Sequence, residues 1–185
     1  QFDVEKRESI KTLILTLWKR EDEAPTRAEE VALSGAVNAY IRKISGDRSV
    51  RPDFNGFYEF VSVDYRRMIE GKRVREKDFD IDGFLNVLEP FYRGGDYDFL
   101  LNSDKELDLT NKRFIVFELD NIGSNKVLLP VVTLIIMETF IAKMRRLKGV
   151  RKMILIEECW KALMSANMSE YIKYLFKTVR KYFGE

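Results

Sequence analysis

The chain contains no histidine and only one cysteine among its 185 residues. Without histidine an imidazole cannot serve as the catalytic base, and a single cysteine cannot form a disulfide framework. The same scarcity argues against a zinc site, because structural zinc is held mainly by several Cys and His ligands. The composition is typical of a protein from a reducing, cytoplasmic setting.

Long hydrophobic runs and targeting signals are missing as well. The longest apolar run, residues 127–137, is interrupted by Pro130 and Thr133, and an acid follows it. It is too short to cross a bilayer, so we expect a soluble protein. The chain begins at Gln1 without a signal-peptide pattern, and the start without Met predicts that it is part of something longer.

A phosphate-binding loop of the form G-x-x-x-x-G-K-[ST] is also absent. The one Gly-Lys pair, Gly71-Lys72, is followed by Arg73, and Arg66 stands where the first glycine is required. Such loops matter because their backbone N–H groups cradle phosphates. If the chain handles a nucleotide, we therefore expect the loop to lie upstream of Gln1.

Helical patterns fill the first half of the chain. Apolar residues recur at helical spacing over residues 4–18, 26–46, 56–69 and 81–91. Thr26 with Glu29 predicts a capping box, and Asp80 predicts an N-cap. The expected core residues are Ile10, Leu13, Ile14, Leu17, Val31, Leu33, Val37, Tyr40, Ile41, Ile44, Phe57, Phe60, Val61, Tyr65, Phe84, Leu85 and Leu88. We predict an all-α subdomain over residues 1–92.

The pattern changes at the glycine pair Gly94-Gly95, which predicts a turn with positive φ. Two later runs, Arg113–Leu119 and Met153–Ile156, are too continuously apolar for half-exposed strands and are typical of strands buried on both faces. The order strand, long helix, strand then predicts a right-handed crossover. The full set is an edge strand at Leu107–Leu109, these two strands, a helix from Leu128 or Leu129 to a Gly149 C-cap, and a last helix at Ser169–Phe183. Residues 93–185 are thus predicted to be part of an α/β domain.

Two acids, Glu157 and Glu158, follow the predicted strand Met153–Ile156. Ligands of open α/β sheets collect at the carboxyl ends of strands. There Glu157 could hold Mg²⁺ or its water, and Glu158 could orient and polarise an attacking water. The alternative is structural, because acids are also favoured in the first turn of a helix. The sequence leaves both interpretations open.

The end of the chain is basic. From residue 143 onward, eleven Lys and Arg side chains stand against four acids. Such a surface could contact the phosphates of a nucleotide or a nucleic acid, or it could be a solvated face. The same alternatives apply to Arg180, which is either a solvated cation or an arginine at the edge of a nucleotide.

Three segments carry a family resemblance: Phe91–Tyr97, Asn111–Asp120 and Met153–Leu163. Together they resemble the conjugation ATPases of type IV secretion systems, in particular the TraG-type proteins of conjugative transposons. The resemblance implies a partial RecA-like P-loop NTPase domain over residues 93–185 that carries the acidic, Walker B-like motif. The helical residues 1–92 would match the all-α insertion of such ATPases.

By that resemblance Glu157 matches the Mg²⁺ acid, Glu158 the catalytic acid and Arg180 the arginine near the nucleotide. The full-length protein is then expected to use ATP and Mg²⁺, whereas the fragment alone is expected to bind neither. Its partners would be further copies in a hexamer and other type IV secretion components, with direct nucleic-acid binding left open. It would act in the cytoplasm, peripheral to the inner membrane.

The function implied is that of a fragment of an ATP-hydrolysing motor that energises conjugative transfer. Two alternatives stay open. One is a docking module that recruits secretion components without hydrolysing anything. The other is a strand-translocating DNA motor, which depends only on the basic end of the chain.

Overall fold

The computed structural model describes residues 4–20, 22–47, 52–102, 109, 111–147, 149–157, 169, 172–173, 176–177 and 179. The chain divides into two compact units. Unit 1 comprises Gln1–Trp18 with Pro25–Lys105, and unit 2 comprises Lys19–Ala24 with Glu106–Glu185. Each is treated by itself below, and the functional boundary between residues 92 and 93 stays a prediction.

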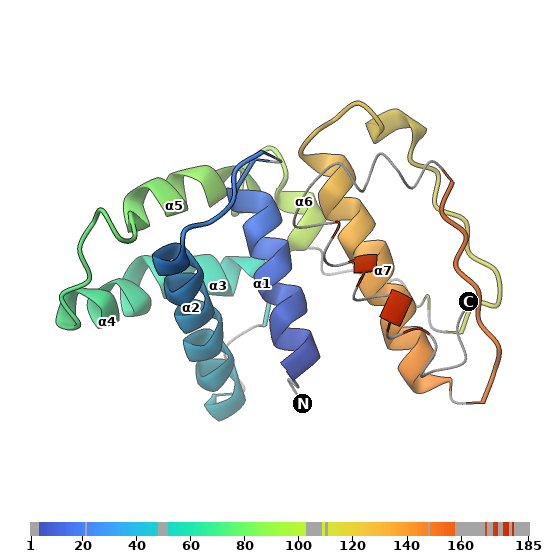
Figure 1. Ribbon diagram of the computed structural model, residues 1–185, viewed down its shortest axis with the longest axis horizontal. Coiled ribbons are helices and arrows are strands. Elements are labelled where there is room, and N and C mark those ends of the chain that lie inside the picture. The colour runs from blue at the N-terminus through green and yellow to red at the C-terminus, as the bar shows by residue number, and fades with distance from the viewer. Residues whose placement is uncertain are drawn as a thin grey trace. The chain divides into compact units, whose positions relative to one another are not determined.

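Unit 1 consists of helices joined by short connections (Figure 1). They are α1 (Val4–Trp18), α2 (Arg27–Gly46), α3 (Phe54–Phe60), the π-helical turn η1 (Val61–Tyr65), α4 (Arg66–Gly71), α5 (Ile81–Leu88), the 3₁₀ turn η2 (Glu89–Phe91) and α6 (Asp98–Leu101). The four predicted helices are confirmed. The third is the continuous run α3–η1–α4, and the fourth is α5 followed by η2.

The predicted helix starts are confirmed by their caps. Thr26 Oγ1 accepts from the N–H of Glu29 at 3.3 Å, and the Glu29 carboxylate accepts from the N–H of Thr26 at 2.7 Å. Asp80 Oδ1 accepts from the N–H of Gly83 at 2.9 Å. Each cap satisfies backbone donors that a helix cannot pair internally, so these starts are fixed locally.

Aromatic side chains dominate the core of unit 1. Trp18 at the end of α1 meets Phe84 of α5 edge-on, with ring centroids 4.8 Å apart, and Phe79 at 5.8 Å. Most of the predicted core is confirmed as buried: Ile14, Leu17, Leu33, Val37, Tyr40, Ile41, Phe57, Phe60, Val61, Tyr65, Phe84, Leu85 and Leu88. The prediction that Val31 belongs to the core is wrong, since this residue is 66% exposed. It stands two residues before Leu33, about 200° around the helix from that buried position.

The π-turn η1 places one tyrosine deep inside unit 1. Tyr65 Oη donates to the backbone oxygen of Ala32 on α2 at 2.7 Å. A Cβ added to Gly35 would lie 2.7 Å from this hydroxyl, so the glycine leaves the room that the ring needs. Burial raises the pKa of Tyr65 above its ordinary value, and the phenol therefore stays neutral and able to donate.

The glycine pair predicted to form a turn belongs to a segment held against the start of α3. Gly94 has φ +81°, which confirms the expected positive φ. Asn102 Nδ2 donates to the backbone oxygen of Phe91 at 2.9 Å, and its Oδ1 accepts from the N–H of Asn55 at 2.9 Å. Asn55 in turn accepts from the N–H of Arg93 at 3.0 Å. These bonds make the turn a packed part of unit 1.

Gly95 in this turn has no room for a side chain. An added Cβ would lie 2.4 Å from the backbone oxygen of Pro90 and 2.8 Å from that of Glu89. Because both neighbours are backbone atoms, we expect Gly95→Ala to lower the free energy of unfolding by about 1–3 kcal/mol. Urea denaturation of the 185-residue chain, followed by circular dichroism, measures this. Gly46→Ala is the matched control, since nothing lies within 4 Å of that position; equal stability of the two variants would contradict the prediction.

Unit 2 is built on the long helix α7 (Leu128–Arg146), which follows the 3₁₀ turn η3 (Asp120–Ile122). The Asn125 side-chain oxygen accepts from the N–H groups of Val127 and Leu128, each at 2.9 Å. Pro130 stands in the first turn of the helix, as predicted. The buried face of α7 comprises Pro130, Val131, Thr133, Leu134, Met137, Ile141 and Met144. The predicted C-cap at Gly149 is wrong, because α7 ends at Arg146 with Leu147 as its C-cap. Gly149 lies beyond the cap and has a positive φ of +74°.

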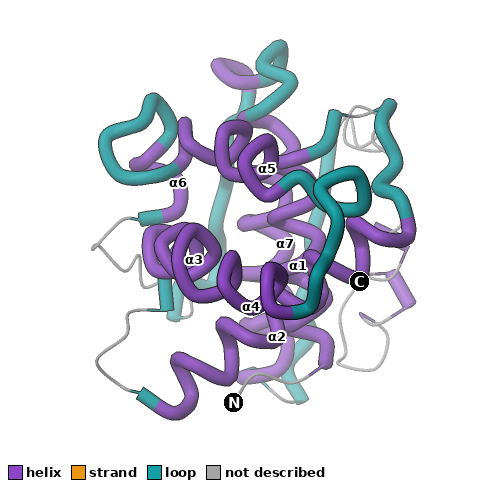
Figure 2. The backbone as a smooth tube through the Cα atoms, turned by 90° about the vertical axis from the view of Figure 1, so that its left-hand side faces the viewer, coloured by secondary structure: helices purple, strands orange, loops and turns teal. Residues whose placement is uncertain are grey.

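The predicted α/β, RecA-like fold class is wrong, because the described residues contain helices and loops but no β-strand (Figure 2). Arg113–Leu119 and Met153–Ile156 lack regular secondary structure, and Phe114 and Leu155 are 85% and 80% exposed. The physical reason is that a parallel strand is stable only when it pairs with neighbours in a sheet covered on both faces. Neither run has such neighbours in the described part of the chain. Leu107, Asp108 and most of the predicted last helix lie outside it.

Candidate functional site

The acidic pair predicted to carry the chemistry follows the segment Met153–Ile156 in unit 2. Glu157 forms an exposed turn at the end of this segment, where its carboxylate faces solvent. Exposure alternates along residues 151–157, as in an extended chain with one face covered. Glu158 lies outside the described residues, so its catalytic role stays a prediction.

Two lysines tie the apolar segments of unit 2 to one end of α7. Lys143 Nζ donates to the backbone oxygen of Leu109 at 2.8 Å and also to that of Lys112, just before the segment Arg113–Leu119. Lys152 Nζ, just before Met153, donates to the backbone oxygen of Met144 at 3.3 Å. Both segments thus start at the C-terminal end of α7, and they run back toward its N-terminal end (Figure 1).

This shared starting point has a consequence for the acids. Glu118 closes one segment and Glu157 closes the other, and both are exposed. The two segments run in the same direction along α7, so they end on the side of unit 2 where this helix begins (Figure 1). Carboxylate oxygens are the ligands that Mg²⁺ prefers, so Glu157 has the chemistry of the predicted metal ligand.

Sequence reasoning missed the part that Lys143 and Lys152 play. Lys143 donates to carbonyl groups 31 and 34 residues earlier in the chain, and no local sequence pattern predicts such a contact. The one available signal was the general preference of cations for the C-terminal end of a helix, where carbonyl groups are unpaired.

Arg180, the third predicted site residue, lies outside the described residues. Its neighbour Val179 is helical and 5% exposed, which confirms the predicted inward position of Val179. The role of Arg180 itself stays a prediction.

Two features are lacking among the described residues. No group of three or more His, Cys, Asp or Glu side chains in that part of the chain could hold a metal ion. No helix there is long and apolar enough to cross a bilayer.

Comparison with known proteins gives one match. No curated protein and no solved structure matches the chain. A protein-family model, described as the TraG P-loop domain, matches residues 1–185, which is the whole chain. The resemblance to TraG-type proteins is thereby confirmed. The chain belongs to the TraG P-loop domain family, which makes it an ATPase-type protein related to conjugation.

Proposed function

We propose that this chain is part of an ATP-hydrolysing motor that energises conjugative transfer by type IV secretion. The observation that carries the proposal is the pair Glu157-Glu158, which directly follows the apolar segment Met153–Ile156 in a member of this family. Paired acids in this position are used by nucleotide hydrolases to hold the metal and to position the attacking water. In this role the pair is the Walker B-like motif of the motor.

The roles of the two acids differ. Glu157, one methylene longer than the usual Asp, holds Mg²⁺ through a water, and its exposed place at the end of the segment suits a hydrated cation. Glu158 accepts a hydrogen bond from the attacking water and orients it toward the terminal phosphate. Bound ATP with Mg²⁺ supplies the phosphoryl group that is transferred.

The rest of the proposal concerns assembly and place. The phosphate loop comes from outside these 185 residues, which contain no G-x-x-x-x-G-K-[ST] sequence. The motor works as a hexamer with other type IV secretion components, in the cytoplasm and peripheral to the inner membrane. Support for this comes from membership of the TraG P-loop domain family.

The 185-residue chain by itself should not bind ATP in the micromolar range. Backbone N–H groups and the lysine of a phosphate loop supply most of the phosphate contacts in P-loop proteins, and this sequence has no such loop. Isothermal titration calorimetry with ATP and Mg²⁺ measures the affinity directly. Micromolar binding would contradict the idea that the loop lies elsewhere.

Arg180→Ala in the full-length hexamer should lower the ATPase rate by at least about tenfold. A guanidinium at the nucleotide edge stabilises charge on the phosphoryl group during transfer, and such arginines are worth about 10³–10⁵ in rate. The melting temperature and the assembly state should hardly change, which separates this role from a structural one. Arg42→Ala, at an exposed position on α2, is the matched control. An unchanged rate in a folded hexamer would exclude Arg180 from catalysis.

A second candidate function is a docking module that recruits secretion components without hydrolysis. It is favoured by the missing phosphate loop and by the exposed apolar side chains Phe114 and Leu155. The two functions separate in a transfer assay in cells. If Glu158→Gln leaves conjugative transfer unchanged, the docking module is the better description.

A further inference from the structure

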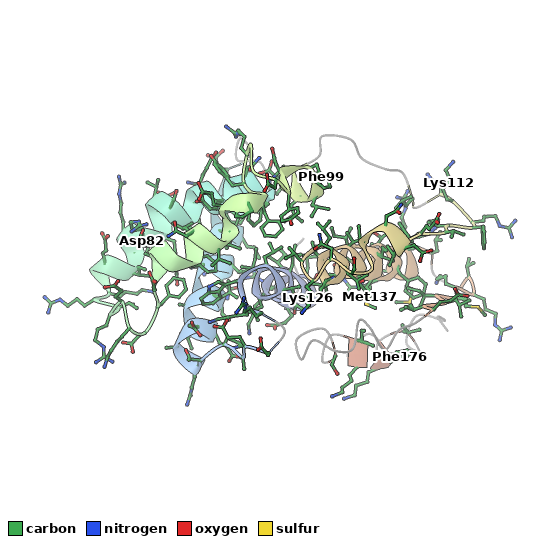
Figure 3. All side chains as sticks on the ribbon, turned by 90° about the horizontal axis from the view of Figure 1, so that it is seen from above. Asp82, Phe99, Lys112, Lys126, Met137 and Phe176 are labelled. Carbon is green, nitrogen blue, oxygen red and sulfur yellow. The ribbon has the colours of Figure 1, made fainter. Side chains whose placement is uncertain are left out.

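The helix α4 and its connection to α5 in unit 1 are rich in cations. We call residues Arg67–Lys77 the basic elbow. Within and beside it, two arginines are engaged in ion pairs: Arg66 with Asp82 at 2.6 Å, and Arg75 with Asp78 at 2.7 Å. The hydrogen-bonded Arg66 guanidinium lowers the pKa of Asp82, whose position near the elbow is labelled in Figure 3. The first pair links α4 to α5, and the second lies within the connection between them.

Four further cations of the elbow remain available to a partner. Arg67, Lys72, Arg73 and Lys77 are exposed, and none forms an ion pair with a described residue. The acids Glu70 and Glu76 are exposed between them and moderate the local charge. The tip, residues 72–75, reads Lys-Arg-Val-Arg. Arg75 is paired with Asp78, so the positive charge of the tip comes from Lys72 and Arg73.

The backbone of the tip is well determined by hydrogen bonds. The N–H of Arg73 donates to the Glu70 oxygen at 2.9 Å, and the N–H of Val74 donates to the Ile69 oxygen at 3.1 Å. Arg73 adopts φ +57°, a conformation that glycine takes at much lower cost than a side-chain-bearing residue. The end of α4 thus holds an arginine at a position where the backbone favours glycine.

Exposed apolar side chains accompany these cations. Val74 at the tip is 39% exposed, and Met68 on α4 is 44% exposed. Phe79, the one aromatic residue in 66–82, is buried at 3% exposure and cannot stack on a base. Binding to single-stranded nucleic acid depends on exposed aromatic platforms, whereas a mixture of cations and aliphatic side chains suits a lipid headgroup region. The elbow therefore fits an anionic lipid surface better than a nucleic acid.

We propose that the basic elbow docks unit 1 onto an anionic phospholipid surface. The cations Arg67, Lys72, Arg73 and Lys77 lie against the headgroup phosphates, while Val74 enters the boundary between headgroups and acyl chains. This deepens the peripheral membrane position in the proposed function and rests on it. Lipid docking by the elbow does not involve the acids of unit 2. An experiment can therefore contradict lipid docking without contradicting ATP hydrolysis, and the reverse.

The test is co-sedimentation of the 185-residue chain with lipid vesicles. The wild-type chain binds vesicles that contain phosphatidylglycerol and not vesicles of pure phosphatidylcholine. Arg73→Gly weakens binding about fivefold, the loss expected for one cation at an anionic surface. Its melting temperature stays the same or rises, because glycine adopts the positive φ without steric cost. Val74→Asp weakens binding by at least about fivefold, since it adds a repelled charge at the tip.

Arg42→Ala is the matched control, because it removes one exposed cation from α2, outside the elbow. It leaves vesicle binding unchanged if the elbow is the docking surface. No binding to phosphatidylglycerol vesicles overturns the proposal, and so does equal weakening by Arg42→Ala and Arg73→Gly, which would indicate attraction by overall charge. Binding of an oligonucleotide that depends on Arg73, without vesicle binding, would overturn it in favour of a nucleic acid. None of these results depends on ATP hydrolysis, which the Arg180 variant tests.

Discussion

Glu158→Gln in the full-length protein should keep ATP binding and lose about 10²–10⁴ in turnover. Glutamine preserves the size and polarity of the side chain but cannot take a proton or accept a water's hydrogen bond with a carboxylate's strength. The binding contacts come mainly from the phosphate loop and the metal, so affinity should hardly change. Steady-state ATPase assays with a parallel measurement of nucleotide binding separate the two effects.

Glu118→Gln is the matched control for this experiment. Glu118 is an exposed acid that closes the other apolar segment of unit 2, and it is not part of the acidic pair. Its loss should leave turnover within a few-fold of wild type. If Glu158→Gln behaves in the same way as Glu118→Gln, the acidic pair is structural and the motor proposal fails.

Phe84→Ala should cost unit 1 about 3–5 kcal/mol of unfolding free energy. The ring is 1% exposed and packs between Trp18, at 4.8 Å, and Phe79, at 5.4 Å. Truncation leaves a cavity between α1 and α5 that neither ring can close without losing its other contacts. Because small units have only about 5–15 kcal/mol in total, the variant should unfold at a much lower urea concentration.

The control for Phe84→Ala is the same substitution at a phenylalanine of unit 1 that is exposed to solvent. Phe99 on α6, labelled in Figure 3, is 66% exposed. Phe99→Ala should change the unfolding free energy by less than about 0.5 kcal/mol. If the two variants denature at the same urea concentration, as followed by circular dichroism, the packing of α1 on α5 contributes little to stability.

The helices of unit 1 could be predicted because their causes are local. The capping box at Thr26, the N-cap at Asp80 and the spacing of apolar residues all act within a few positions of the chain. Val31 was misplaced because it is apolar but lies two positions away from the buried Leu33. To predict which apolar residues of a helix are buried, their angular positions around the helix axis must be considered as well as their residue types.

The lack of strands in the described residues could not be predicted, because strand formation depends on partners distant in sequence. The run Met153–Ile156 has the composition of a buried strand, yet Met153 and Leu155 are 71% and 80% exposed. Composition indicates that such residues favour burial, but not whether a neighbouring strand is present to pair with them. Glu157 ends its segment at an exposed turn rather than at the end of a strand, and its role as the Mg²⁺ acid stays a prediction. The contacts that Lys143 makes with Leu109 and Lys112 could not be predicted for the same reason, because their partners are distant in sequence.

The π-turn η1 explains an unusual rhythm in the sequence of the third helix. Its inward residues Phe57, Val61, Tyr65 and Ile69 recur every four positions, and all four are buried. In a regular α-helix, each step of four overshoots a full turn by about 40°, so three steps would carry Ile69 about 120° away from the direction of Phe57. The wider turn at Val61–Tyr65 takes up much of this excess. Buried apolar residues at every fourth position, kept over several turns, therefore indicate that the helix contains a wider π-helical turn. Without such a turn the helix could not keep these residues on one side, toward its neighbours.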